Sequence, residues 1–572
     1  PLYNARGGFA MIRRAFTLFI VTVAISSLTL QAGSVPQRAR LGMVITQSDI
    51  ASQVGFEVIK SGGNAIDAVV ATGLALAVTH PTAGNIGGGG FIVYRPATGE
   101  PAAYDFREVG PSRSSPEMWL TDGKYDFDKH HNSHLSVGVP GTVAGLHLAW
   151  KEAGSKPWKE LVAPAIKLAR DGFEVSHGLA RSLAGQLDDF QKYPASLAQF
   201  SKNGKPYEAG DILKQPDLAR TLTRIAEQGP AGFYEGETAA LIEKEMRANN
   251  GLITMADLKA YQAKKRTVVK GTYRGYDVIG MPPPSSGGMA VIQMLNVLEG
   301  YDLKANGYGS AKNIHLTAEA MRRAFADRAR YLGDPDFEKD IPLPMLISKD
   351  YAAQQRKTIN PDKASKSSTS SFTWTSESPE TTHVSIVDAK RNAVAMTYTL
   401  EYGYGSRIVV PGAGFLLNNE MGDFNAAPGL TDERGLIGTN PNLARPGKRM
   451  LSSMAPTIVS RDGQLVMVTG TPGGRTIINT VLTTILNVID YGMNAQEAVD
   501  AGRMHHQWLP DRINIERFGF SADTIKMLQA MGHTVNEGNN QGAAQVIVFN
   551  QKDNMLEGGV DRRPPDGGAA GK

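Results

Sequence analysis

The chain has 572 residues, 41% of them hydrophobic and 20% charged, and carries a formal net charge of +4 at pH 7. These proportions are ordinary for a folded globular protein and exclude a disordered or fibrous chain, while the length is sufficient for a large core. The sequence contains no cysteine, which excludes disulfides, thiol catalysis and lipoprotein acylation of a cysteine.

The N-terminal segment has the pattern of an export signal. Arg13 and Arg14 precede the apolar run "AFTLFIVTVAISSLTL", and small residues follow near "LQAGS". We expect the signal to begin at Met11, with residues 1–10 as upstream sequence, and we exclude residues 1–32 from the fold. The alternative is a membrane anchor, but an apolar run of 16 residues is short for a span and no stop-transfer pattern follows it. We therefore predict an exported protein, periplasmic or else extracellular, without a stable membrane anchor.

The charge of the remaining chain bears on its partners. Residues 1–32 contain three arginines and no acidic residue, so their removal lowers the net charge from +4 to +1. A nearly neutral exported chain gives no electrostatic reason to bind nucleic acid, and we expect no nucleic-acid partner.

The first half of the mature chain is predicted to be mostly helical around a few strands. Residues 49–78 have a helical pattern that becomes almost wholly apolar in "AIDAVVATGLALAV", as in a helix buried inside a layered core. The glycine-rich turn "THPTAGNIGGGG" leads into the strand "FIVY". Residues 313–332 predict a helix with a charged outer face. Three more helices are indicated by Leu218, Leu222 and Ile225, by Leu241, Ile242 and Met246, and by a capping box of Thr254 and Asp257.

The second half begins with a Ser/Thr/Lys-rich linker at about 361–380 and is then richer in strands. "THVSIVD" and "NAVAMTYTL" flank the turn "AKRN" and predict a β-hairpin in which successive side chains face opposite ways. "QLVMVTG" predicts a strand, "TPGG" a tight loop and "RTIINTVLTTILNVIDYG" the helix that follows. "SADTIKMLQAMG" predicts another helix, and "AAQVIVFN" and "NMLEGGVD" predict two strands, the second of them the last. Strands with helices before and after them indicate a helix-covered sheet sandwich.

Two glycine-rich stretches and two groups of histidines give no predicted site. "GGGG" at 87–90 lacks the context of a dinucleotide loop, and "GTPGGRT" at 470–476 lacks the lysine of a phosphate loop. The histidines have no acidic or histidine partner at a metal-ligand spacing on a clear helix. They are His130, His131 and His134, and His505 and His506. We therefore expect no metal and no other cofactor.

Thr381 stands where the linker meets the first strand after it. The simpler interpretation is that a β-branched threonine suits the first position of a strand. The alternative is that the chain is cut between Glu380 and Thr381, which gives the threonine hydroxyl a free α-amine as its base. A linker is where a break disturbs few contacts. Self-cleavage needs only the attack of the Thr381 hydroxyl on the Glu380 carbonyl, which forms an ester that water then opens.

An acyl-transfer site also needs hydrogen-bond donors for the oxyanion of its tetrahedral intermediate. Gly473 and Gly474 lie at a predicted strand-to-helix turn, where backbone N–H groups at a helix N-terminus suit that task. The alternative for this pair is a plain tight turn.

A further set of polar residues is suited to an amino-acid head group. Glu420 and Asp423 in "NNEMGDF" are spaced to meet an ammonium. Arg107 in "DFREVGP" and the hydroxyls of Ser452 and Ser453 in "LSSM" are suited to a carboxylate. One ammonium and one carboxylate together make the head group of an amino acid.

Six motifs in the right order resemble γ-glutamyltransferase, the N-terminal-nucleophile hydrolase that cleaves glutathione. The resemblance extends from about residue 41 to residue 566, and several motifs in agreement are specific although each alone is not. The motifs are "DFREVGP", "PPPSSGG", "TTHVSIVDAKRNAVAMTYTL", "LLNNEMGDF", "LSSMAPTIV" and "GTPGGRTIINT".

The resemblance implies a precursor that cuts itself before Thr381 into a large subunit of about 33–380 and a small subunit of 381–572. It implies an α+β fold, a four-layer αββα sandwich shared by both subunits. Thr381 would take the γ-glutamyl group of glutathione or a related compound and pass it to water, an amino acid or a dipeptide, with Thr399 supporting its hydroxyl.

The resemblance also assigns roles to the other candidate residues. The substrate carboxylate would be held by Arg107, Ser452 and Ser453. The substrate α-amine would be held by Glu420 and Asp423. The oxyanion hole would be formed by Gly473 and Gly474.

Two features depart from the family pattern. Glu401 follows "TYTL" where many members have asparagine, and it adds a third acid near the ammonium, as in some bacterial members. The segment "GLTDERGLIGTNPNLARPGKR" has the length of a lid loop but no tyrosine, and Arg434 stands about where a lid tyrosine is expected. A lid without its tyrosine should exclude water less well, so we expect substantial hydrolysis near neutral pH and dominant transfer to dipeptides only in alkaline solution.

Two other functions remain as alternatives. A cephalosporin acylase shares the fold, the self-cleavage and the threonine nucleophile but removes a glutaryl group without an α-amine. Glu420 and Asp423 would then be a desolvated acid pair with no ammonium to meet, which is costly. An exported binding protein for γ-glutamyl compounds needs the same head-group site but no chain break. One uncut band on a denaturing gel would favour the binding protein and two bands the enzyme.

Overall fold

The computed structural model of the protein describes residues 34–368, 381–430 and 438–572, and residues 36–572 form one compact unit. The predicted export signal, Glu380 and Arg434 lie outside the described residues. Along the described ranges, no helix combines the length and the hydropathy needed to cross a membrane.

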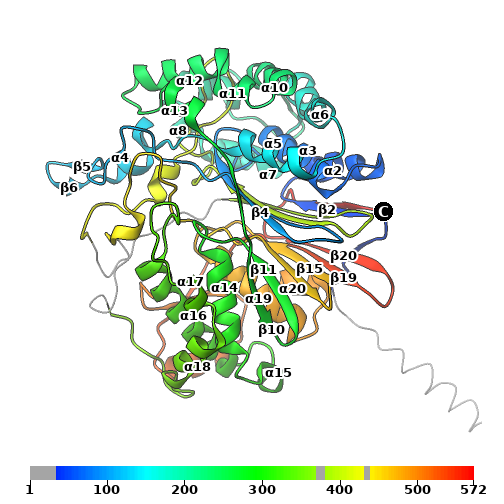
Figure 1. Ribbon diagram of the computed structural model, residues 1–572, viewed down its shortest axis with the longest axis vertical. Coiled ribbons are helices and arrows are strands. Elements are labelled where there is room, and N and C mark those ends of the chain that lie inside the picture. Colours follow the sequence, from blue (N-terminus) through cyan, green and yellow to red (C-terminus); the bar gives the residue numbers. More distant parts are fainter. Residues whose placement is uncertain (1–33, 369–380, 431–437) are drawn as a thin grey trace, which may run out of the picture. The chain divides into compact units, whose positions relative to one another are not determined.

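Two seven-stranded antiparallel sheets pack face to face, and helices cover the outer face of each (Figure 1). The first sheet has the order β1 (Gln37–Ala39), β20 (Met555–Val560), β19 (Gln545–Asn550), β15 (Gln464–Gly470), β14 (Thr457–Arg461), β11 (Tyr276–Gly280) and β10 (Val269–Tyr273). The second has the order β21 (Gly568–Gly571), β2 (Met43–Thr46), β12 (Thr382–Val387), β13 (Ala393–Thr399), β3 (Gly89–Arg95), β4 (Ala102–Asp105) and β9 (Lys264–Arg266). The predicted αββα sandwich is confirmed.

The two helical layers are drawn above and below the sheets in Figure 1. The layer over the second sheet contains α2 (Asp49–Lys60), α3 (Ala65–Thr79), α5 (Thr142–Ala153), α6 (Trp158–Asp171), α10 (Pro216–Gln228), α12 (Gly236–Ala248) and α13 (Met255–Ala260). The layer over the first sheet contains α14 (Gly287–Leu298), α16 (Ala311–Tyr331), α17 (Leu343–Leu346), α18 (Lys349–Lys357), α19 (Thr476–Ile489) and α20 (Ala495–Asp500), and α21 (Ala522–Ala530) packs on α16. Each layer has its own large core cluster of buried apolar side chains.

The predicted helical run of residues 49–78 is divided into α2 and α3. The break falls at "SGGN", because Gly62 adopts a φ of +90°, which favours glycine, and Asn64 caps the second helix. Asn64 and Asp67 form a capping box, and all fifteen residues of α3 are buried, as the apolar pattern predicts. The predicted capping box of α13 is present as well.

The predicted charged outer face of α16 is wrong at four of its charged positions. Glu319, Arg322, Asp327 and Arg328 are all buried. Each is held by polar partners inside the fold; for example, the carboxylate of Asp327 accepts hydrogen bonds from the side chains of two glutamines and a tyrosine. Buried charge is tolerated when it is paired and hydrogen-bonded in this way.

The predicted hairpin of β12 and β13 is present, with Thr382 opposite Tyr398 and Val387 opposite Ala393. β12 also pairs with β2, so it lies inside its sheet rather than at an edge. Val384 and Ile386 face the core beneath α3, as the alternation predicts. On the other side, the Ser385 hydroxyl donates to the carbonyl of Gln545 in the facing sheet.

The final strand was not predicted. β20 is followed by β21, the segment "GAAG", which pairs with β2. Glycine and alanine have low strand propensity, so the sequence carries no local signal for this strand.

Candidate active site

A small cavity of about 20 Å³, room for about one water molecule, gathers almost all of the predicted site residues. It is lined by Arg107, Thr381, Thr399, Glu401, Glu420, Asp423, Ser452, Ser453, Met454, Gly474 and Ile477. Gly473 adjoins Gly474, and Glu380 lies outside the described residues. Residues more than 300 positions apart in the chain therefore converge on Thr381.

The hairpin brings two threonines together at one end of the cavity. Thr381 directly precedes β12, and Thr399 ends β13, the neighbouring antiparallel strand. Thr381 is buried, with 5% of its surface exposed. The Thr399 hydroxyl oxygen accepts a hydrogen bond of 2.9 Å from the backbone N–H of Glu401, which fixes its orientation.

The turn between β15 and α19 contributes the glycine pair. Gly473 has a φ of +132° and Gly474 a φ of +54°, both in the region that favours glycine. A Cβ on Gly473 would also lie 2.4 Å from the Thr476 hydroxyl oxygen. The turn ends at the N-terminus of α19, where the N–H groups of Thr476 and Ile477 donate to the carbonyls of Gly473 and Gly474 at 3.0 and 3.1 Å.

Arg107 is the centre of a buried ion-pair cluster. One of its terminal nitrogens pairs with Glu420 and the other with Asp423, both from a 3₁₀ helix, η2 (Glu420–Asp423). Glu108 lies 3.7 Å from Arg107 in addition. The structure thus pairs the groups that the sequence analysis assigned to opposite ends of an amino-acid head group.

Glu108 was missed by the sequence analysis, although it follows Arg107 in "DFREVGP". It is fully buried, and neither of its carboxylate oxygens has a hydrogen-bond partner among the described residues. Burial raises the pKa of Glu108 to about 8, although Arg107 acts in the opposite direction. Burial also raises the pKa of Glu420 well above its usual range. One arginine cannot balance three buried carboxylates, so the cluster retains a proton on a carboxyl group at neutral pH.

The two serines are held by a partner that the sequence analysis did not name. The Ser453 hydroxyl accepts a hydrogen bond of 3.0 Å from Arg328, which also donates to the Ser286 hydroxyl at 2.7 Å. The Ser286 hydroxyl in turn donates to the Ser452 carbonyl at 2.7 Å. The motif "PPPSSGG" and helix α16 therefore position the serine pair through Arg328.

One of the histidines that were excluded as metal ligands, His131, lies beside Glu401. His131, on the short helix α4 (Phe127–His131), approaches Glu401 with 3.2 Å between its Nδ1 and a carboxylate oxygen. The ring of Tyr402 stacks on His131 at 5.2 Å between centroids. Burial lowers the pKa of His131 to about 4, against the effect of Asp423, so its ring is neutral at pH 7.

The described ends of the predicted lid segment are tied to the site. The Gly429 N–H donates to the Gly438 carbonyl at 3.0 Å, so these two described residues lie close together. The Asn442 side chain donates to the Asp423 carbonyl at 2.7 Å and accepts from the N–H of Leu451 at 2.8 Å. Asn442 thereby connects this segment to Asp423, in the ion-pair cluster, and to Leu451, which precedes the serine pair.

The cavity itself does not present three side chains in a metal-ligand arrangement within the described ranges. The part of the chain that the structure describes contains one such group elsewhere, His315, Glu319 and His533.

Comparison with known proteins gives a consistent result. The gamma-glutamyltranspeptidase family model matches residues 51–571. The chain is 48% identical over 540 residues to the glutathione hydrolase proenzyme of Escherichia coli (strain K12), covering 94% of this chain and 93% of that one. It is 37% identical over 523 residues to the acylase ACY 1 proenzyme of Pseudomonas sp. (strain SE83), covering 90% and 91%. The crystal structure of cephalosporin acylase from Bacillus halodurans matches with a TM-score of 0.83 and 26% identity over 96% of this chain and 98% of that one.

Proposed function

The chain belongs to the gamma-glutamyltranspeptidase family, and we propose that Thr381 is the nucleophile through which it acts. The enzyme is a γ-glutamyltransferase and glutathione hydrolase: it transfers the γ-glutamyl group of glutathione and related compounds to water or to an amine. The observation that supports Thr381 is the cavity that it shares with Thr399, the serine pair and the acid cluster.

The proposed reaction begins with attack of the Thr381 hydroxyl oxygen on the γ-carbonyl carbon, while the α-amine of Thr381 takes the hydroxyl proton. The N–H groups of Gly473 and Gly474 stabilise the oxyanion. The C–N bond then breaks, the leaving amine receives the proton, and an ester remains on Thr381. Water or an acceptor amine then gives a proton to the same α-amine and attacks the ester carbonyl. The ester bond breaks, and the Thr381 oxygen takes that proton from the α-amine.

Substrate binding exchanges one set of ion pairs for another. The substrate carboxylate replaces an acid on Arg107 and accepts from the hydroxyls of Ser452 and Ser453, while its ammonium binds to Glu420 and Asp423. Glu401 adds a third acid to that ammonium site. Because each charge keeps a partner in the exchange, the buried cluster does not have to leave a charge uncompensated.

The α-amine of Thr381 requires a cut, which we place between Glu380 and Thr381. This gives a large subunit ending at 380 and a small subunit of 381–572. We further propose that residues 1–32 direct export, so that the enzyme acts outside the cytoplasm.

The acylase alternative is less favoured because a glutaryl group has no ammonium for Glu401, Glu420 and Asp423. A direct test is to compare hydrolysis of a γ-glutamyl anilide with that of the matching glutaryl anilide. We expect at least about a hundredfold preference for the γ-glutamyl compound, because leaving buried acids without their cation is costly. Equal rates would favour the acylase.

N-terminal sequencing of the smaller band of the purified protein tests the position of the cut and should read TTHVSI.

A further inference from the structure

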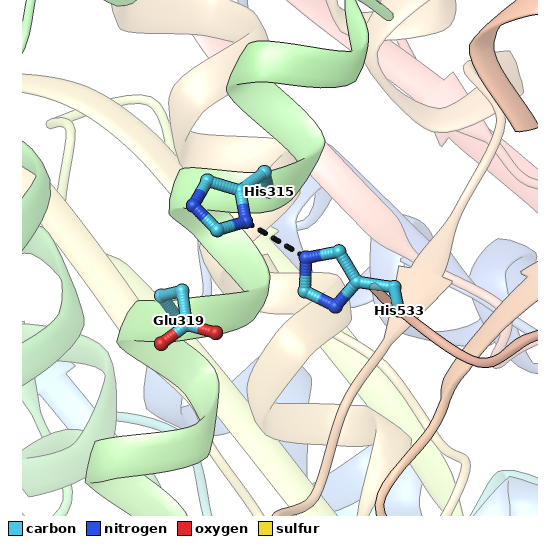
Figure 2. Close-up of side chains that lie close together, drawn as sticks. All are labelled: His315, Glu319 and His533. Carbon is cyan, nitrogen blue, oxygen red and sulfur yellow. Dashed lines mark hydrogen bonds between the residues drawn. The ribbon is translucent and has the colours of Figure 1, made fainter. Parts of the chain in front are cut away.

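A second group of chemically competent side chains lies among the helices over the first sheet. His315 and Glu319 project from α16, and His533 follows the end of α21 (Figure 2). All three are buried, and one ligand atom from each lies within 4.8 Å of the other two. Arg328, which contacts the serine pair, is thirteen residues further along α16, so this group is about 20 Å along the helix from that contact.

The two imidazole rings face each other with defined orientations. The Nε2 of His315 is 2.8 Å from the Asn360 carbonyl and donates to it, which leaves the lone pair of His315 on Nδ1. That Nδ1 lies 2.7 Å from the Nε2 of His533. A ring N–H held by a backbone carbonyl, with the other nitrogen directed at a shared point, is the arrangement found around histidine ligands of metals.

Glu319 completes the group from the same face of the helix. His315 and Glu319 are four residues apart, so their side chains lie one turn from each other. The Glu319 oxygens accept from Arg322 at 3.4 Å, from Arg323 at 2.6 Å and from the N–H of Ser365 at 3.0 Å. A carboxylate oxygen has two lone pairs, so these bonds leave acceptor capacity on Glu319.

The local charges limit which ion can bind. Arg322 and Arg323 both pair with Glu319, and Arg322 also pairs with Asp511, so the two arginines and the two carboxylates balance each other before an ion arrives. A hard cation such as Ca²⁺ or Mg²⁺ needs more oxygen ligands than one carboxylate supplies. Two imidazole nitrogens and one carboxylate oxygen instead suit Zn²⁺ and its neighbours in the d-block.

We propose that His315, Glu319 and His533 bind one Zn²⁺ ion, with water in the fourth tetrahedral position. Zinc–nitrogen bonds of about 2.0–2.1 Å at a tetrahedral angle separate two nitrogens by about 3.3 Å, so the rings must move apart by roughly 0.6 Å. When the ion binds, the hydrogen on Nε2 of His533 moves to its Nδ1, which frees Nε2 to bind the ion. His533 stays neutral in this change.

The proposed ion connects parts of the chain that lie on either side of Thr381. His315 and Glu319 precede Thr381, and His533 follows it. The same group contacts Asn360 and Ser365, in the segment that leads to the linker. If the cut that belongs to the proposed function takes place, the ion joins the two subunits noncovalently.

The test uses the purified, tag-free protein after treatment with a chelator. Zn²⁺ is titrated by calorimetry, and the bound metal is counted by mass spectrometry after desalting. We expect one tightly bound ion per chain. His315→Gln and His533→Gln should bind Zn²⁺ at least about tenfold more weakly, whereas His177→Gln, which removes an exposed histidine, should bind it normally. Absence of a stoichiometric ion, or equal binding by all three variants, would overturn the proposal and leave only a hydrogen bond between the rings.

Two further measurements separate this site from misfolding and from the catalytic function. Co²⁺ should give visible absorption bands of a nitrogen-ligated site in the wild type that are lost in His533→Gln, and Zn²⁺ should raise the melting temperature of the wild type but not of that variant. If His533→Gln has the melting temperature of the wild type and keeps its Co²⁺ bands, His533 is not a ligand and the assignment is contradicted. None of these measurements depends on glutathione hydrolysis, so failure of the proposed function leaves them unaffected.

Discussion

The hydroxyl of Thr381 is proposed to attack twice, first the Glu380 carbonyl of its own chain and later the γ-carbonyl of a substrate. Both reactions are acyl transfers, so they can use the same oxyanion donors in the same cavity. They differ in their base. Before the cut the nitrogen of Thr381 is an amide and cannot accept the proton, so self-cleavage is expected to be slower than turnover.

Thr381→Ala should leave the chain in one piece, because alanine has no hydroxyl to attack the Glu380 carbonyl. The matched control is Thr382→Ala. The Thr382 hydroxyl is buried without a hydrogen-bond partner among the described residues, so the loss of this hydroxyl should not stop the cut. Denaturing gels of both purified variants decide the matter, and cleavage of the Thr381→Ala protein would exclude self-cleavage by this residue.

Arg107→Lys should raise the KM for a γ-glutamyl substrate by roughly 10–100-fold while the precursor is still cut. Lysine keeps the charge but loses the planar pair of donors, and a hydrogen bond to a charged group contributes about 1.5–3 kcal/mol. Steady-state kinetics and a thermal melt of Arg107→Lys should be compared with those of Arg113→Lys, an arginine that contacts only backbone carbonyls in the described structure. An unchanged KM would remove Arg107 from the site.

Glu108 should make the protein less stable as the pH rises. Its pKa is raised from 4.5 to about 8 by burial, so the folded protein holds a proton that the unfolded chain releases between these values. The stabilising effect is complete below about pH 4.5 and is lost as the pH rises through about 8. Glu108→Gln should remove roughly 4 kcal/mol of this decrease in the free energy of unfolding between pH 5 and pH 9. Urea denaturation at both pH values measures it.

Glu160→Gln, at an exposed glutamate, is the control for the loss of one carboxyl group and should follow the wild type. If Glu108→Gln shows the same pH dependence as the wild type, the proton of the buried cluster resides on another carboxyl group.

At the scale of helices and strands, the sequence predicts what is local and misses what is not. The β12–β13 hairpin and the capping box of α13 follow from periodicity and capping chemistry within a few residues. The buried charges of α16 could not be predicted, because Arg328 is compensated by Ser286 and Ser453, which lie far from it in the chain. For the same reason no signal in the sequence brings His315 and Glu319 together with His533.

The candidate site also combines residues that local motifs identify with residues that only long-range contacts identify. Thr381, Arg107 and the serine pair stand in motifs that could be identified one at a time. Glu108 belongs to the site because it is buried beside Arg107, and His131 because it is buried beside Glu401. These contacts exist only in the folded chain. The departure at Glu401 is visible in the sequence, but its contact with His131 is not.

Gly473→Ala should lower kcat by about 10²–10³-fold, the usual effect of losing an oxyanion donor. Alanine is strained at the φ of +132° that Gly473 adopts, and its Cβ would lie 2.4 Å from the Thr476 hydroxyl oxygen. Both effects should displace the turn before α19. The control is Gly463→Ala, which also has a positive φ, +74°, but nothing within 4 Å of an added Cβ. Strain alone should cost that variant stability but not kcat. Equal kcat values for the two variants would exclude the turn from catalysis.

At the scale of the whole molecule, the proposed subunits share both sheets. In the second sheet β2 lies between β21 and β12, and β13 pairs with β3, so strands from before and after Thr381 are hydrogen-bonded to each other. The first sheet likewise joins β1 to β20 and β11 to β14. A cut before Thr381 breaks none of these pairings, and the subunits should remain associated without a covalent bond.

Unfolding should be easier to reverse for the uncut chain than for the cut one. After dilution from urea, Thr381→Ala should recover its native fluorescence and circular dichroism in a first-order process, since its strands belong to one molecule. The cut wild type should recover less and should depend on protein concentration, because its two chains must first meet. Equal recovery that is independent of concentration in both proteins would contradict the interleaved assembly.

The position of β12 inside its sheet also makes assembly directional. One chain builds the sheets, and the proposed cut before Thr381 would then remove the connection that guided the pairing of β12 with β2. We therefore expect the cut enzyme to refold poorly, so that its working lifetime depends on the rate at which it first unfolds rather than on an unfolding equilibrium. A protein exported beyond the reach of ATP-driven chaperones would gain from such a design, because a slow first unfolding protects it better than a capacity to refold.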